Sequence, residues 1–274
     1  MRQIGCIPTK KFYPDTTLVR DMMYTAKKLK SNVVMFPEAG YSLDGRKTVL
    51  PRGLGVILKR FKVPVVTVTT WGAFARDPLY NCLQIRKVKV RADVTCLFTA
   101  EEIKTKTVAE LDAALDEAFG FDNFRYQQEN KQKIDEAFRA EGLNRILYKC
   151  PHCGAEGKTE GKGTMLTCHS CGKAYELTEY GYLEATDGAS AFTHVPHWYA
   201  WQRQEVKKEL IDGTYRLDVP VKIGMIVDYS ALYMVGTGRL THTTEGFTLT
   251  SDDGQIHFTQ PPLASHTLNI FGDH

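Results

Sequence analysis

The chain has 274 residues, of which 43% are apolar, so it can bury a sizeable core and has room for two or more domains. Apolar runs such as Val63 to Val68 are far too short to span a bilayer, and the N-terminus lacks the pattern of a signal peptide. The net charge of +3 hides an asymmetry, because residues 1–100 hold 18 Lys and Arg against 6 Asp and Glu (+12), and the rest hold 17 against 26 (−9). A first region this basic favours anionic partners, such as phosphorylated small molecules, nucleic acid or an acidic lipid surface.

The first hundred residues alternate between strand-like and helix-like segments. A strand over residues 3–9 precedes a helix that is predicted from apolar positions at helical spacing, namely Val19, Met22, Met23, Ala26 and Leu29. The run 33–36 predicts a buried parallel strand that stops at Pro37, because proline has no N–H to donate. A helix to Phe61 and a strand over 63–68 follow. This order predicts right-handed crossovers and a mostly parallel sheet.

Two further patterns extend this α/β region to about residue 140. From residue 83 to 97 apolar and charged residues alternate, which predicts a half-exposed edge strand with Val88, Val90, Ala92 and Val94 facing inward. Residues 101–140 are charged and predict two helices, the second with a stripe of Ile134, Ala137 and Phe138.

Glu38 stands at the position of greatest chemical interest in this region. It comes directly after the predicted strand 33–36 and its terminating proline, and open α/β sheets place their ligand crevices at the carboxyl ends of strands. The small residues that follow, including Gly40 and Ser42, would let a ligand approach the backbone. The alternative interpretation is a strand end with a solvated glutamate.

Four cysteines form the most specific motif in the chain. Cys150 and Cys153 make one pair, Cys168 and Cys171 the other, with 14 residues between the pairs, and each pair is followed by glycine. Two such knuckles supply a closed tetrahedral set of thiolates, so the spacing predicts a structural Zn²⁺ site in a zinc ribbon. His152 and His169 are alternative ligands that the four-cysteine set does not need. The few basic residues in the ribbon favour a structural or protein-contact role over nucleic-acid binding.

The last part of the sequence is different in character. A linker near 186–191 leads to a helix over 197–210, and residues 213–274 contain short β-like runs separated by Gly and Asp turns, with Asp252-Asp253-Gly254 as a hairpin corner. This pattern predicts a small antiparallel sandwich or barrel. It contains no cluster of catalytic residue types, so an accessory binding module is expected.

Three stretches of the first region, in order, resemble the phospholipid/glycerol acyltransferase family, the lysophosphatidic acid acyltransferases. The stretch from Gly5 to Lys11 is similar to that family's glycine-led strand ending in a basic residue, with lysine where arginine is usual. Residues 36–42 (Phe-Pro-Glu-Ala-Gly-Tyr-Ser) match four of the seven positions of its Phe-Pro-Glu-Gly-Thr-Arg-Ser block, and Val63-Pro-Val-Val66 matches its third block. The resemblance covers roughly residues 1–100.

The resemblance implies transfer of a fatty acyl group from an acyl thioester, carried by coenzyme A or acyl-carrier protein, to a lysophospholipid or glycerol-phosphate-type acceptor. It assigns Lys11 to a phosphate contact and Glu38, Gly40 and Ser42 to the acceptor pocket. Tyr41 replaces the block's arginine and removes one phosphate donor. It also implies phospholipid biosynthesis at the cytoplasmic face of the inner membrane, with peripheral contact to anionic lipid.

The family's general base, a histidine followed five positions later by aspartate, has no counterpart in this sequence. Only four residues precede Gly5, and none of the eight histidines has aspartate at that spacing. Loss of such a base typically costs a factor of about 10² to 10⁴ in rate. Two explanations stay open: an N-terminally truncated chain, which the start inside a strand favours, and a non-catalytic relative. Under the first, the expected histidine and aspartate lie upstream of Met1, so no catalytic residue is assigned within this chain.

The expected organisation therefore has three parts. Residues 1–140 form a partial acyltransferase-like α/β domain, 146–186 the zinc ribbon, and 192–274 a helix with a β-rich accessory domain. The alternative function is a zinc-ribbon adaptor, or a non-catalytic protein that binds anionic lipid or nucleic acid. Nucleic acid is not expected, because the basic residues are not interleaved with aromatic ones.

Overall fold

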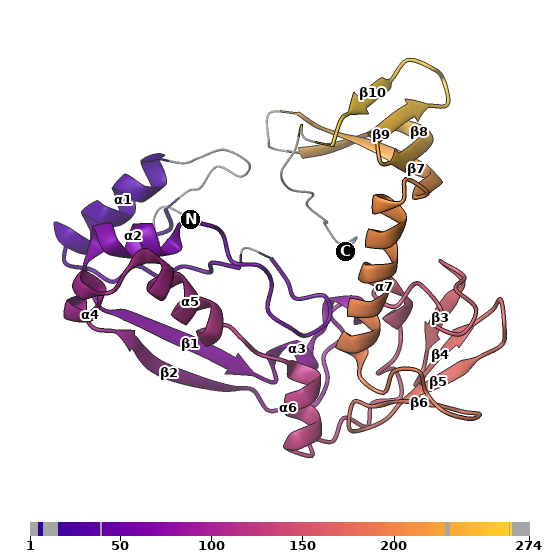
Figure 1. Ribbon diagram of the computed structural model, residues 1–274, viewed down its shortest axis with the longest axis horizontal. Helices are drawn as coiled ribbons and strands as arrows, with labels where there is room; N and C mark the ends of the chain where they lie inside the picture. The colour runs from indigo at the N-terminus through magenta and orange to yellow at the C-terminus, as the bar shows by residue number, and fades with distance from the viewer. Residues whose placement is uncertain (1–4, 8–15, 39, 228–230, 263, 265–274) are drawn as a thin grey trace. The chain divides into compact units, whose positions relative to one another are not determined.

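The computed structural model describes residues 5–7, 16–38, 40–227, 231–262 and 264. The chain divides into two compact units, which span residues 1–199 and 200–273 (Figure 1). The predicted strand over residues 3–9 lies largely outside the described residues, and so do Met1 and Lys11.

The helices of the first unit are mostly short. They are α1 (Thr16–Lys27), α2 (Leu54–Phe61), α3 (Ala73–Arg76), η2 (Leu79–Asn81), α4 (Ala100–Thr105), α5 (Val108–Ala118), α6 (Asn123–Glu129) and η3 (Leu143–Arg145). The predicted helix through Val19 and Met22 is confirmed as α1, and the predicted helix ending at Phe61 as α2.

Two capping boxes explain why α4 and α5 begin where they do. Thr99 and Thr107 each accept a hydrogen bond from the backbone N–H three residues later, where Glu102 and Glu110 reach back to the threonine. Hydrogen bonds from the threonine backbone N–H and hydroxyl groups lower the pKa of both glutamates. The sequence alone carries this signal, because each threonine precedes a glutamate by three residues.

The sheet in the predicted α/β region, residues 1–140, is antiparallel, so the prediction of a mostly parallel sheet is wrong. Strand β1 (Val65–Trp71) pairs with β2 (Arg91–Phe98), Val68 opposite Val94. Helices α2, α4 and α5 pack on one side of this pair around Leu54, Phe98, Ile103, Leu111 and Leu115. Val94, which was expected to face inward, is exposed. Alternation indicates which residues share a face, but it could not indicate which face the helices cover.

The run 33–36 is not a strand, which corrects the prediction on which the parallel topology depended. Val34 is 81% exposed and Phe36 85% exposed, and neither belongs to a ladder. A strand requires a partner as well as an apolar sequence, and among the described residues β1 pairs only with β2. Apolar runs of this length are ambiguous without that information.

The second helix predicted within 101–140 is not found at its apolar stripe, because Ala137 and Phe138 lie outside any helix. Helix α6 ends at Glu129, and Ile134 is buried in an irregular segment instead. Its backbone N–H donates to the carbonyl of Glu179 at 2.8 Å. Tertiary contact with the following region therefore replaces the helical hydrogen bonds.

A buried polar network joins this α/β part to the region that follows it. The guanidinium of Arg86 donates to the hydroxyl of Tyr80 and to the carbonyl of Arg139, each at 2.9 Å, and also to the side-chain oxygen of Asn81. Arg139 in turn donates to the carbonyl of Leu177 at 2.5 Å. Each of these two guanidinium groups makes several hydrogen bonds, which offset the cost of burying its charge in a core.

Replacing Arg86 with methionine is expected to destabilise the first unit by about 3 kcal/mol, because oxygen acceptors in the core lose a charged donor. The measurement is the free energy of unfolding in urea. Arg76→Met, at an exposed position on α3, is the control and should change it by less than about 0.5 kcal/mol. Equal effects of the two substitutions would contradict the assignment of the network as structural.

The four-cysteine region forms a small antiparallel sheet of its own. Its strands are β3 (Thr159–Lys162), β4 (Met165–Cys168), β5 (Ala174–Leu177) and β6 (Leu183–Ala185), in that order across the sheet. Helix α7 (Val195–Ile211) follows and confirms the helix predicted there. Trp198, near the start of this helix, is fully buried. Its ring packs edge-to-face against Tyr175 with the ring centroids 4.9 Å apart, and its indole N–H donates to the carbonyl of Lys149.

The second unit contains one four-stranded antiparallel sheet in the order β10-β9-β8-β7. Its strands are β7 (Arg216–Val227), β8 (Ala231–Thr243), β9 (Gly246–Ser251) and β10 (His257–Gln260). The antiparallel β-rich character and the corner at residues 252–254 are as predicted, but within the described residues the strands form a single sheet, not a sandwich or barrel.

Candidate functional site

A cavity of about 360 Å³ in the first unit brings together three of the predicted substrate residues. Glu38, Gly40 and Ser42 all line it, together with Tyr41. The volume is at the small end of the range for ligand pockets, about 300–1,000 Å³.

Two of the sequence-based expectations about this site fall outside the described residues. Lys11, the predicted phosphate contact, is one of them, so its position relative to the cavity is not described. The other is the general base, which was expected upstream of Met1 and therefore stays an untested prediction. Within the described residues, no histidine lines the cavity in its place.

The rest of the cavity wall comes from segments far apart in the sequence. The remaining lining residues are Val68, Thr69, Thr70, Ala73, Phe74, Asp77, Pro78, Leu79, Leu83, Ala118, Phe119, Phe121 and Asn123. They belong to β1, to the segment from α3 to Leu83, and to the segment from the end of α5 to the start of α6. The cavity therefore combines an apolar wall with a few polar groups, as small-molecule sites usually do.

Glu38 is held in place by its neighbours. One of its carboxylate oxygens accepts a hydrogen bond from the backbone N–H of Thr48 at 2.8 Å and another from the Thr48 hydroxyl at 3.1 Å. The same side chain lines the cavity. The carboxylate is thus oriented by a neighbouring backbone group, as positioning residues in binding sites often are.

Ser42 is fixed by the turn that follows it. Its hydroxyl donates to the carbonyl of Arg46 at 2.5 Å, and Arg46 forms an ion pair with Asp44 at 2.8 Å. Gly45, between them, has a φ of +80° and a backbone so close to the Phe74 ring that a Cβ would lie 2.9 Å from it. Only glycine fits this position, and the tight packing holds residues 42–46 against the cavity wall.

A buried pair at the edge of this region was not identified from the sequence. His194 and Asp122 share a hydrogen bond of 2.8 Å, and Asp122 also caps α6 by accepting from the backbone N–H of Arg125. Burial opposes ionisation of Asp122, but the hydrogen bonds from His194 and Arg125 outweigh it and lower its pKa. His194 also lies 3.2 Å from the amide nitrogen of Gln128.

The His194–Asp122 pair is structural, because both ring nitrogens of the histidine are engaged and neither residue lines the cavity. The Asp122 cap has a local signal, the aspartate before a short helix. Its histidine partner is 72 residues away, and no local pattern connects the two.

Asp77 also lines the cavity, although it was not predicted from the sequence. No short motif surrounds it, and its relevance depends on the turn after α3. With Glu38 it makes the described lining acidic, and no lysine, arginine or histidine is among the described lining residues. The phosphate donor that the family resemblance implies is therefore not found among these residues.

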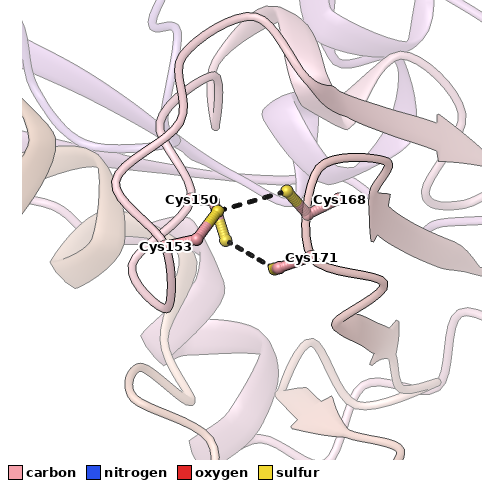
Figure 2. Close-up of side chains that lie close together, drawn as sticks. All are labelled: Cys150, Cys153, Cys168 and Cys171. Carbon is pink, nitrogen blue, oxygen red and sulfur yellow. Dashed lines mark hydrogen bonds between the residues drawn. The ribbon is translucent and has the colours of Figure 1, made fainter.

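The side chains of the four predicted cysteines converge (Figure 2). All four Sγ atoms lie within 4.8 Å of one another. The Sγ atoms of Cys150 and Cys171 are 3.8 Å apart, and so are those of Cys153 and Cys168. Tetrahedral metal–thiolate bonds of about 2.3 Å place sulfur atoms about 3.8 Å apart, so the cluster fits a four-coordinate ion.

The two pairs of cysteines lie in matching turns. In each, the glycine after the second cysteine donates its N–H to the carbonyl of the first: Gly154 to Cys150 at 2.9 Å, and Gly172 to Cys168 at 2.8 Å. Both glycines have a positive φ, +74° and +75°. This is the geometry that the sequence predicted for each knuckle, because residues other than glycine rarely adopt it.

The cysteines differ in their burial and in their acidity. Cys150 and Cys168 are buried, and burial raises the pKa of Cys150 to about 12. Cys153 is exposed, and the backbone N–H of Ala155 lowers its pKa to about 7. A buried thiol with no cation beside it is costly to ionise.

Comparison of the chain with models of known families, with curated proteins and with solved structures gives no match. Inference about function therefore rests on the two sites themselves. None of the helices in the described part of the chain has the length and apolar character needed to cross a membrane.

Proposed function

We propose that the cavity beside Glu38 is the acceptor pocket of a lysophospholipid or glycerol-phosphate acyltransferase. The observation that carries the proposal is that residues 38, 40 and 42, assigned to the acceptor pocket by resemblance of their sequence block, line one cavity together with β1 and the end of α5. The apolar part of the wall suits the first methylene groups of an acyl chain, and the polar part suits a glycerol hydroxyl. The acyl donor would be a thioester of coenzyme A or acyl-carrier protein.

In this proposal the chain supplies acceptor binding and positioning. Glu38, oriented by Thr48, would accept a hydrogen bond from a hydroxyl of the glycerol group. No histidine in the sequence has an aspartate five positions later, so deprotonation of the attacking hydroxyl has no assigned group here. The chain by itself is expected to bind the acceptor and to release free coenzyme A from an acyl thioester no faster than background.

We also propose that the four cysteines hold one structural Zn²⁺. All four ligand positions are filled by protein sulfur, which leaves no open position for a substrate. Zinc suits a tetrahedral site with four thiolates better than calcium or magnesium, which prefer oxygen ligands. Its role would be to close the fold of the ribbon, since four short strands bury little apolar surface.

The proposed place of action is the cytoplasmic face of the membrane, where the acceptor resides. Its support is the balance of +12 in residues 1–100, which would attract anionic lipid headgroups. The contact would be peripheral and sensitive to salt.

Blocking the cavity is expected to abolish acceptor binding. Ala118 lines the cavity at the end of α5, and Ala118→Trp would fill it with an indole ring. The affinity of the full chain for lysophosphatidic acid below its critical micelle concentration, measured by calorimetry, should fall about ten-fold or more.

Ala113→Trp is the matched control, because Ala113 is exposed on the same helix and away from the cavity. It should leave the affinity unchanged. Glu38→Gln, compared with Glu117→Gln on the exposed side of α5, tests the carboxylate separately. Absence of lysolipid binding by the wild-type chain, or equal binding by the Ala118 and Ala113 variants, would refute the acceptor pocket.

A further inference from the structure

The hairpin of β7 and β8 in the second unit exposes an unusual concentration of apolar side chains at one end. Leu232 is 64% exposed and Met234 60% exposed, and Met225, Tyr233 and Val235 are also exposed. These five residues, called the apolar end below, lie near the end of β7 and the start of β8. An exposed apolar surface of this kind marks a binding site more often than it arises by chance.

The apolar end is exposed on both faces of the hairpin. Leu232 and Met234 flank Gly224, where a Cβ would lie 2.7 Å from Leu232 Cδ1 and 3.4 Å from Met234 Sδ. Tyr233 stands opposite Met225 in the ladder, and its side chain points to the other face because successive residues of a strand alternate. Strand β9 pairs with β8 only from Gly238 onward, so it covers none of this end.

Cations and a polar hollow follow immediately along the same two strands. A hollow of about 320 Å³ is lined by Lys222, Thr237, Arg239 and Asp252, among others. Arg239 is held by Asp218 through hydrogen bonds of 2.8 and 3.0 Å, and the Thr237 hydroxyl donates to Asp252. Lys222 is opposite Thr237 in the ladder, close to the apolar end.

We propose that this hairpin binds a lipid surface, with the apolar end among the acyl chains and the hollow at the level of the headgroups. The backbone of residues 224–227 in β7 is about 10 Å long, which matches the depth of about 5–10 Å reached by interfacial segments. Tyr233 has the amphipathic ring that favours the membrane interface. Lys222 and Arg239 would meet lipid phosphate, and Asp252 a headgroup ammonium.

A lipid surface fits these observations better than a second protein strand does. The ladder passes from Ile223 opposite Gly236 to Gly224 opposite Met234, so Val235 is an extra residue that forms a bulge in β8. On β8 this bulge interrupts the straight edge that an added strand requires. Strand addition would also leave much of both faces uncovered, whereas acyl chains can surround them.

The test is co-sedimentation of the full chain with vesicles of phosphatidylethanolamine and phosphatidylglycerol. It is done at about 1 M NaCl, where charges are screened within about 3 Å and attraction by the basic first region is suppressed. The wild-type chain should bind, and the double variant Leu232→Ser/Met234→Ser should bind about ten-fold less. Phe258→Ser is the matched control, because Phe258 is also exposed, on β10, and it should bind like wild type.

A second measurement reports insertion directly. Tyr233→Trp should gain fluorescence that is quenched by lipids with brominated acyl chains, beyond the quenching of the wild-type tryptophans. Zinc content and circular dichroism of each variant establish that it is folded. Lack of wild-type binding at high salt, or equal binding by the double variant, would overturn the proposal while leaving the acceptor pocket untouched. A concentration-dependent dimer that the double variant loses, without vesicle binding, would assign the surface to a second copy instead.

Discussion

Replacing Cys168 with serine is expected to abolish binding of the proposed zinc ion and to unfold the ribbon. Cys168 is buried, and its sulfur is one of four that lie within 4.8 Å of one another. Structural zinc in small domains supplies about 10–16 kcal/mol of apparent binding free energy, more than a few short strands can replace. The zinc content per chain, measured by mass spectrometry of the metal, should fall from one to near zero, with loss of protection from hydrogen exchange over 150–185.

Cys96→Ser is the matched control, because Cys96 is a free cysteine outside the cluster. It should leave the zinc content unchanged. Zinc affinity should also fall as the pH decreases, because every ligand must be a thiolate and protons compete for it. A Cys168→Ser chain that keeps one tightly bound zinc would contradict the four-cysteine site.

Truncating Trp198 to alanine is expected to destabilise the first unit by about 3–5 kcal/mol. The indole is fully buried, packs against Tyr175, and donates its N–H to the carbonyl of Lys149. Alanine would leave a large cavity and would remove the hydrogen bond to the Lys149 carbonyl, next to the cysteine cluster. The measurement is the denaturant midpoint at saturating zinc.

Tyr180→Ala is the control for that substitution, because Tyr180 is an exposed aromatic residue in the same region. It should change the free energy of unfolding by less than about 0.5 kcal/mol. Similar shifts for the two variants would show that α7 does not depend on Trp198 for its packing.

The cysteine cluster shows how well a local motif predicts structure. Both knuckles and their glycines at positive φ followed from residue spacing, because each knuckle is complete within five residues of chain. The meeting of the four sulfurs followed from the distance between the two pairs in the sequence. The helices α1, α2 and α7 were also predicted, since the spacing of apolar residues along a helix is a local pattern. Zinc as the bound ion stays a prediction.

The sheet of the first unit shows where local reasoning fails. Strand β1 was expected two residues early and parallel to the run 33–36, but it pairs antiparallel with β2. Both runs are apolar, and the choice of partner depends on loop length and on helix packing that no short pattern encodes. Residues 131–142 were misassigned for the same reason, because Ile134 gains its hydrogen bond from Glu179, far along the chain.

The cavity could be predicted only in part. Glu38, Gly40 and Ser42 are close in sequence, so their convergence was expected from the motif, whereas Asp77, Ala118 and Asn123 come from distant segments. Lys11 stays an untested prediction, since it lies outside the described residues. The acyltransferase activity is likewise a proposal that depends on what this cavity binds.

Photo-crosslinking with a diazirine-bearing lysophosphatidic acid tests most directly whether the cavity beside Glu38 binds the lysolipid acceptor. After irradiation of the full chain and peptide mapping, the account predicts adducts on the cavity wall, in residues 40–42, 68–79 and 118–123, that excess unlabelled lysolipid removes. Adducts confined to other segments, or adducts that unlabelled lysolipid does not compete away, would contradict it.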